Sequence, residues 1–168
     1  MNESNRIMPI HQYISNDKFE TGTFKDIGAV VNVTVVYVPA SEGFGQFYYD
    51  VEYHGFDHEF PSQRNPDMNF GIPGDCTVNI KLQDPQNWRW SKQYYALTAK
   101  KSLTKIYKDY SFDEKTQTVT FKAKMDKMPP KKYYFIMNVD ILQKESSAEY
   151  KWLSVSIDPW VLNPQLPQ

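Results

Sequence analysis

Hydrophobic and polar residues alternate along most of the chain with a period of two, which is typical of β-strands that bury one face. The clearest segment covers residues 26–38, where valines at odd positions share one face: Val31, Val33 and Val35. The same alternation occurs in residues 47–54, 76–82, 118–125, 133–141 and 152–157. Each of these segments predicts a strand with one apolar and one more polar face.

Two stretches are less regular. Residues 88–100 fit two short strands or one bent strand. Residues 102–110 fit a short helix about as well as a strand, because Leu103, Ile106 and Tyr107 also have helical spacing. The whole pattern amounts to roughly seven to nine strands separated by turns, with no long helix.

Such a pattern predicts an all-β protein, most simply an immunoglobulin-like antiparallel β-sandwich, with a jelly roll as the alternative. The chain has 168 residues, which is enough to bury one substantial core. We expect residues 26–160 to form the sandwich, residues 1–25 to form an N-terminal arm, and residues 161–168 to form an extended tail.

The longest irregular stretch is residues 55–74, which contains three glycines and three prolines. Irregular connections of this length are uncommon in compact domains and are often functional. The stretch also carries several large apolar side chains, including Phe56, Phe60 and Phe70. We therefore expect it to pack against the sandwich rather than to extend into solvent.

Composition adds limits on location. Cys76 is the only cysteine, so no disulfide can form within the chain, and its strand alternation predicts a buried, unreactive thiol. No run of 18 apolar residues occurs and the first residues lack the apolar stretch of a signal peptide. We expect a cytoplasmic protein, or one exported without a cleaved signal, and no contact with a membrane.

The one pattern that suggests a metal lies just after a strand and consists of His54, Asp57, His58 and Glu59. Imidazole and carboxylate groups would suit zinc. Two histidines four residues apart share a face only on a helix, and Gly55 and the nearby prolines disfavour one. A polar loop with solvated histidines is the favoured interpretation.

The chain also lacks a nucleophile elbow, a phosphate loop and a dinucleotide fingerprint, so we expect no cofactor.

Trp88 and Trp90 belong to the densest aromatic cluster of the sequence. Aromatic rings on a sheet face can stack on sugars, which suggests a carbohydrate-binding module. Aromatic side chains more often fill cores, and this is the favoured interpretation.

Charge is unevenly distributed along the chain. Residues 1–91 hold 12 acidic and 6 basic residues, whereas residues 92–132 hold 11 lysines and 4 acidic residues. The basic stretch contains no arginine, so nucleic-acid binding is disfavoured. Opposite charges on two surfaces favour self-association. The candidate interface is formed by large side chains predicted to point outward, namely Tyr134, Ile136 and Trp152.

The C-terminal third has a distinctive sequence pattern, YYFIMNVDIL followed by EYKWLSVSIDPWVLNP. It resembles the closing hairpin of bacterial β-sandwich proteins that end in a D-P-x-[IV] element, here Asp158 to Val161, including the inclusion-body family of the AidA/PixA type. The segment TVNIKLQDPQNWRWS is similar to the middle strand pair of that family. The resemblance implies a soluble cytoplasmic sandwich that self-associates and has no known chemistry.

From these observations we expect a non-catalytic binding or self-assembling protein rather than an enzyme, with a second copy or another protein as its partner. A carbohydrate-binding module that uses Trp88 and Trp90 is the first alternative. A metal-dependent enzyme that uses His54, Asp57 and His58 is the second.

Overall fold

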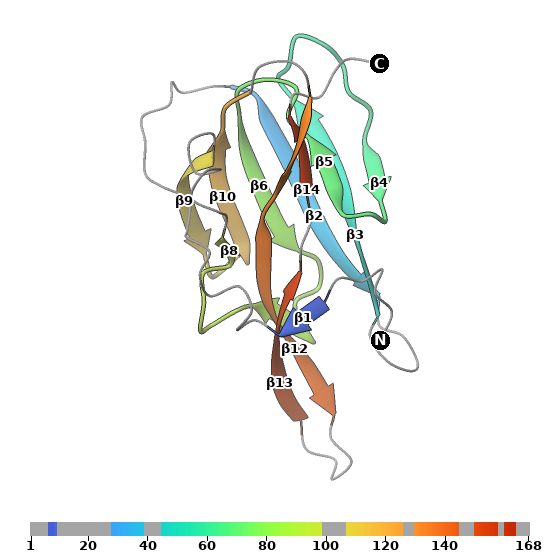
Figure 1. Ribbon diagram of the computed structural model, residues 1–168, viewed down its shortest axis with the longest axis vertical. Coiled ribbons are helices and arrows are strands. Elements are labelled where there is room, and N and C mark those ends of the chain that lie inside the picture. The colour runs from blue at the N-terminus through green and yellow to red at the C-terminus, as the bar shows by residue number, and fades with distance from the viewer. Residues whose placement is uncertain are drawn as a thin grey trace.

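The computed structural model describes residues 7–9, 28–38, 45–98, 107–125, 130–144, 150–157 and 160–163. These residues form β-strands arranged in packed sheets, and no helix occurs among them (Figure 1). The prediction of an all-β sandwich is confirmed. No described segment is a helix long and apolar enough to cross a membrane.

The larger sheet has six strands in the order β4-β3-β2-β6-β10-β9. Their bounds are β2 Val30–Val38, β3 Gln46–His54, β4 Gln63–Asn65, β6 Cys76–Leu82, β9 Tyr107–Asp113 and β10 Thr118–Ala123. Strands β2 and β3 are antiparallel over nine residue pairs. Strands β2 and β6 are parallel neighbours at the centre of the sheet.

The second sheet has the order β1-β13-β12-β7, with β8 also paired to β12. Its strands are β1 Ile7–Pro9, β7 Trp88–Trp90, β8 Leu97–Thr98, β12 Ile136–Lys144 and β13 Tyr150–Ile157. A small third sheet contains β11 Lys131–Tyr134, β14 Trp160–Asn163 and β5 Asn69–Gly71. In Figure 1 the β12–β13 hairpin crosses in front of the larger sheet and extends beyond its lower end.

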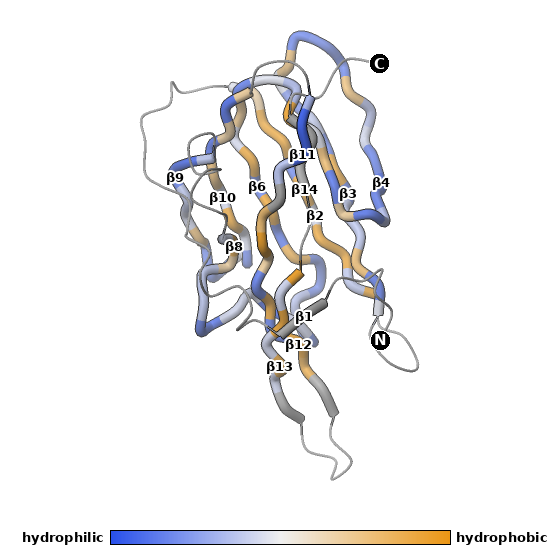
Figure 2. Tube along the Cα trace, in the orientation of Figure 1, coloured by the Kyte–Doolittle hydropathy of each residue, from blue (hydrophilic) through white to orange (hydrophobic). Residues whose placement is uncertain are grey.

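The core lies between the sheets because each long strand turns its apolar face inward. Figure 2 shows hydrophobic residues along β2 and β6 and more hydrophilic residues along the outer strands β4 and β9. The hydroxyl of Tyr49 is buried and donates a hydrogen bond to Sδ of Met137 at 2.9 Å, which links β3 to β12. The largest fully buried side chains come from both the larger and the smaller sheets and from the residue between β11 and β12: Trp90, Tyr49, Tyr107, Phe70, Phe121 and Phe135.

The strand count and two pairings differ from the sequence-based prediction. Strands β4, β5, β7 and β8 contain only two or three residues each, which is too short for a period of two to be visible. The β2–β6 and β5–β14 pairs are parallel, although an antiparallel sandwich was predicted. Residues 107–113 are strand, and a bulge within this strand, where Asp109 and Tyr110 lie opposite Phe121 alone, accounts for their irregular spacing.

The predicted arm and tail lie mostly outside the described residues. Within the arm, Ile7–Pro9 forms β1 and pairs with β13. Within the tail, residues 161–163 belong to β14. The domain boundaries at residues 26 and 160 therefore stay a prediction.

Cys76 is completely buried on the inward face of β6, as the alternation predicted. Burial raises the pKa of its thiol to about 12, because a buried thiolate loses its hydration. We expect the folded protein to resist a thiol reagent at about pH 8 and to react fully once unfolded in urea, because only the thiolate is the nucleophile. Rapid labelling without urea would show that β6 opens locally.

Candidate functional site

A groove of about 390 Å³ lies on the face of the larger sheet that is turned away from β12 and β13. It is lined by Asn32, Val33, Thr34, Asp50, Glu52, Asn79, Lys81 and Thr118. These residues come from the four neighbouring strands β3, β2, β6 and β10. The alternation that buries the odd positions of β2 turns its even positions, Asn32 and Thr34, to this outer face.

Strand register arranges the lining side chains in two rows across the sheet. In the first row Asn32 is opposite both Glu52 and Asn79. In the second row Thr34 is opposite both Asp50 and Lys81. Neighbours within a row are about 4.8 Å apart and the rows are about 6.7 Å apart, given the ordinary dimensions of a sheet. The groove is therefore a small grid of polar groups held by rigid strands.

A chain of hydrogen bonds orders the first row. The hydroxyl of Thr120 donates to Oδ1 of Asn79 at 2.8 Å, and Nδ2 of Asn79 donates to Oδ1 of Asn32 at 3.0 Å. Both amide oxygens therefore accept a bond from the β10 side. The Nδ2 group of Asn32 is left as a donor beside Glu52, since no described residue accepts a hydrogen bond from it.

The two carboxylates of the groove have different surroundings. Arg64 donates two hydrogen bonds to Asp50, at 2.7 and 2.8 Å, and its guanidinium lies 4.6 Å from the ring centre of Tyr48. These bonds lower the pKa of Asp50, so its charge is present and compensated. Glu52 lies 3.5 Å from Nε2 of His54, and both side chains are 60% exposed.

Lys81 is the cation of the groove. It lies on the outer face of β6 and is exposed. No carboxylate of the described residues lies within ion-pair distance of its ammonium. An ammonium without such a partner, placed between Thr34 and Thr118, can bind an anion at little cost, because no existing ion pair must be broken.

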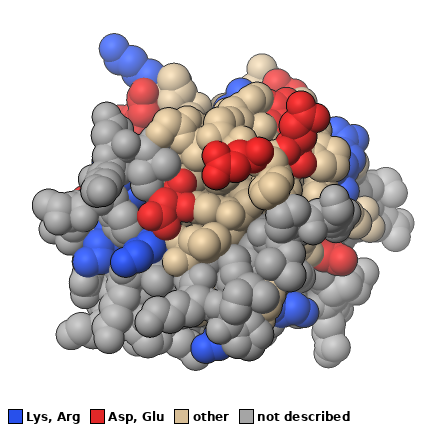
Figure 3. All heavy atoms as spheres, turned by 90° about the horizontal axis from the view of Figure 1, so that it is seen from above, with Lys and Arg blue, Asp and Glu red and all other residues tan. Residues whose placement is uncertain are grey.

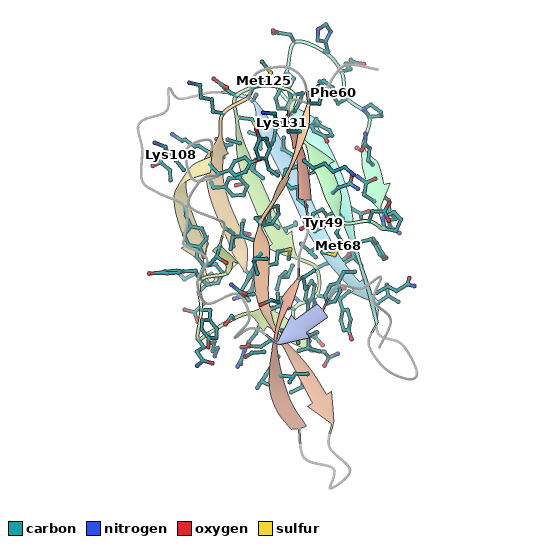
Figure 4. The ribbon with its side chains drawn as sticks, viewed as in Figure 1. Tyr49, Phe60, Met68, Lys108, Met125 and Lys131 are labelled. Atoms are coloured by element: carbon teal, nitrogen blue, oxygen red, sulfur yellow. The ribbon has the colours of Figure 1, made fainter. Side chains whose placement is uncertain are left out.

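A second cavity, of about 280 Å³, lies where the long connection leaves β3. It is lined by Ala29, Gly55, Phe56, Asp57, His58, Phe60, Pro73, Gly74 and Asp75. Phe60 is labelled at this end of the sandwich in Figure 4. Figure 3 looks onto the same end and shows acidic side chains on its described surface, with Lys and Arg toward the margin. This cavity is therefore less suited to an anion than the groove.

The long connection packs against the sandwich, as predicted. Its residues Met68, Phe70 and Ile72 are buried. The rings of Phe56 and Phe60 pack edge to face, with centroids 6.0 Å apart, and both contact Tyr53.

The residues of the suggested metal motif do not converge. His54 lies beside Glu52 on β3, whereas Asp57 and His58 line the second cavity and Glu59 is exposed. The described part of the chain contains no group of three His, Cys, Asp or Glu residues placed to hold a metal. The segment has no helix, which was the condition for both histidines to share a face.

Trp88 and Trp90 are each only 2% exposed and belong to the core, which was the favoured interpretation. Nε1 of Trp88 donates to the carbonyl oxygen of Gln83 at 3.0 Å, and Nε1 of Trp90 donates to that of Gln117 at 2.8 Å. The carbohydrate hypothesis required exposed rings, so these two residues do not support it.

The three candidate interface residues, Tyr134, Ile136 and Trp152, differ in how the structure places them. Ile136 is buried, because the chain passes from β11 of one sheet into β12 of another and is covered on both sides there. Trp152 is half-buried, and the guanidinium of Arg89 lies 3.9 Å from its ring centre. Tyr134 belongs to β11 and pairs with Trp160, but its side chain lies outside the described part of the structure.

A buried polar cluster on the second sheet was missed in the sequence. Nε of Arg89 donates to Asp140 at 3.0 Å, and the hydroxyl of Ser154 donates to the other carboxylate oxygen at 2.8 Å. The side-chain Nδ2 of Asn138 donates to the carbonyl oxygen of Tyr95 at 2.8 Å. The available signal was the placement of Asn138 and Asp140 at alternate positions in the otherwise apolar run from Ile136 to Leu142. The cluster holds the segment after β7 against β12.

A family model described as pNTSase1, predicted novel nucleotide synthetase, matches residues 50–165, which is more than half of the chain. The chain therefore belongs to this family of predicted nucleotide synthetases. The match includes Asp50, Glu52, Asn79 and Lys81 of the groove. No curated protein matches the chain.

This family corrects several expectations drawn from the sequence. The resemblance to the AidA/PixA inclusion-body family is wrong, because it rested on short strand-closing motifs that different sandwiches can share. The interpretation as a non-catalytic binding or self-assembling protein is also wrong, since the family description points to an enzyme. The interpretation rested on the lack of a compact motif, and polar groups that come together from separate strands, as in the groove, leave no such motif. The expected protein partners and cytoplasmic location stay predictions.

Proposed function

We propose that this protein is an enzyme that acts on a nucleotide, and that the groove binds the phosphate groups of that nucleotide at Lys81. The observation that carries the proposal is the ammonium of Lys81, which has no carboxylate partner among the described residues. It lies in a groove lined by amides, hydroxyls and the carboxylates of Asp50 and Glu52. Membership in a family described as predicted nucleotide synthetases supports the choice of ligand.

The chemistry of the groove suits a phosphate chain. Lys81 supplies a positive charge with three donor hydrogens, and Thr34 on one side supplies a hydroxyl group. The hydroxyl of Thr118, on the other side, donates to the carbonyl oxygen of Thr116 at 3.2 Å. The charge of Asp50 is compensated by Arg64, so it opposes an approaching anion less than a free carboxylate would. A fixed ammonium also stabilises the negative charge that develops on phosphate oxygens when a bond to phosphorus is made or broken.

The decisive variant is Lys81→Ala. We expect it to bind the Mg²⁺ complex of ATP, or of whichever common nucleoside triphosphate the protein prefers, at least about tenfold more weakly, a loss of about 1.4 kcal/mol of binding free energy. Isothermal titration calorimetry measures this directly. Mass spectrometry of the nucleotides after incubation would show a new product with the unsubstituted protein and less of it with the variant.

Lys122→Ala is the matched control. Lys122 lies on the same face of the sheet, opposite Thr77, but does not line the groove. We expect this variant to bind as the unsubstituted protein does. Absence of binding to all common nucleoside triphosphates, or equal weakening in both variants, would contradict the proposal.

A further inference from the structure

We propose that Glu52 binds the ribose hydroxyls of the nucleotide, so that the groove selects ribonucleotides over deoxyribonucleotides. This inference rests on the proposed function, in which the phosphates lie at Lys81. It adds the direction in which the nucleotide lies and the class of sugar that it carries.

The spacing of the grid sets the direction. Glu52 and Lys81 occupy opposite corners of the lining, separated by two strand spacings across the sheet and by one row along it. With ordinary sheet dimensions their Cα atoms are about 12 Å apart. Both side chains are long and exposed, so their charged ends can move toward each other over the groove. The sugar and phosphate chain of a nucleotide spans such a distance.

The donors and acceptors at the Glu52 corner match a pair of hydroxyl groups. An ionised carboxylate only accepts hydrogen bonds, and two neighbouring hydroxyls supply two donors. The hydrogen-bond chain from Thr120 through Asn79 leaves Nδ2 of Asn32 as a donor beside Glu52. A ribose hydroxyl can therefore donate to Glu52 while its oxygen accepts from Asn32. An acidic side chain performs the same task for ribose in dinucleotide-binding folds of unrelated architecture.

Charge excludes the opposite direction. A phosphate at the Glu52 corner would meet the carboxylate of Glu52 with that of Asp50 one position along the same face. Arg64 already bonds to Asp50 with two nitrogens and so offsets that charge, whereas no described Lys or Arg lies within ion-pair distance of Glu52. The second cavity beyond this corner is lined by further carboxylates, Asp57 and Asp75. A neutral sugar is the part of a nucleotide that this corner accepts.

The test compares four ligands by calorimetry: the preferred ribonucleoside triphosphate, its 2′-deoxy and 3′-deoxy forms, and inorganic triphosphate. We expect at least one deoxy form to bind about tenfold more weakly, since a hydrogen bond to a charged group contributes about 1.5 kcal/mol or more. In Glu52→Gln this difference should shrink markedly, while the affinity for inorganic triphosphate stays the same or increases because a negative charge is removed.

Glu59→Gln is the matched control, because Glu59 is an exposed carboxylate that lines neither cavity. It should keep the full preference for ribose. Equal binding of the ribose and both deoxy forms, with binding still dependent on Lys81, would overturn this inference and leave the proposed function standing. A ribose preference that survives in Glu52→Gln would also overturn it. If the unsubstituted protein shows no nucleotide binding that depends on Lys81, both the proposed function and this inference are overturned.

Discussion

Replacing Trp90 by alanine is expected to lower the free energy of unfolding by about 4 kcal/mol, the usual loss for a large aromatic side chain removed from a core. The ring is only 2% exposed and packs between the two sheets, where no rearrangement of short side chains can fill its volume. The variant also leaves the carbonyl oxygen of Gln117 without the bond from Nε1. Urea unfolding followed by circular dichroism measures the loss.

Trp152→Ala provides the comparison for this prediction. Trp152 is half-buried and its ring faces Arg89, so its removal should cost much less than that of Trp90. Equal losses in the two variants would mean that Trp90 does not pack as tightly as its burial indicates.

Replacing Arg89 by methionine is expected to lower the free energy of unfolding by about 3 kcal/mol, because a buried carboxylate then remains without its cation. The side chain of Asp140 is 6% exposed and that of Arg89 is 24% exposed, so water cannot replace the guanidinium fully. Methionine keeps most of the length of the apolar stem, which separates the loss of charge from a loss of packing.

The double variant Arg89→Met with Asp140→Asn should recover most of that loss, because no buried charge is left unpaired. Arg64→Met is the matched control, since its pair with Asp50 is exposed and such pairs contribute little. A double variant that is no more stable than Arg89→Met alone would show that the loss comes from something other than the isolated carboxylate of Asp140.

The long strands were predictable because a strand that buries one face in a two-layer fold alternates apolar and polar residues along the sequence. Val31, Val33 and Val35 are all buried, whereas Asn32 and Thr34 are not, so the period of two gave both the strand and its inward face. The same reasoning placed Cys76 in the core, and the preference of aromatic side chains for cores placed Trp88 and Trp90 there. It failed at Ile136, where the chain moves between sheets and both faces are covered.

The candidate site was less predictable for a different reason. Asn32, Glu52 and Lys81 are far apart in the sequence, and each looks like one polar residue among many on the outer face of a strand. They become neighbours only through the pairing of β3, β2 and β6, and a parallel partner with a distant position in the chain cannot be read from local alternation. The composition of the outer faces was visible, but the register that brings them together was not.

The parallel pairing of β2 with β6 also affects how the chain folds. Asn32 and Asn79 can meet only after all of the chain between them has been looped out, including the β3–β4 pair. Closures over such long separations make folding slow, typically milliseconds to seconds for sheet proteins. The groove spans this pair, so it does not exist in any partly folded chain that has yet to join β2 to β6. A bound nucleotide would therefore stabilise the fully folded protein alone, and its effect would appear as slower global unfolding rather than as local protection of one hairpin.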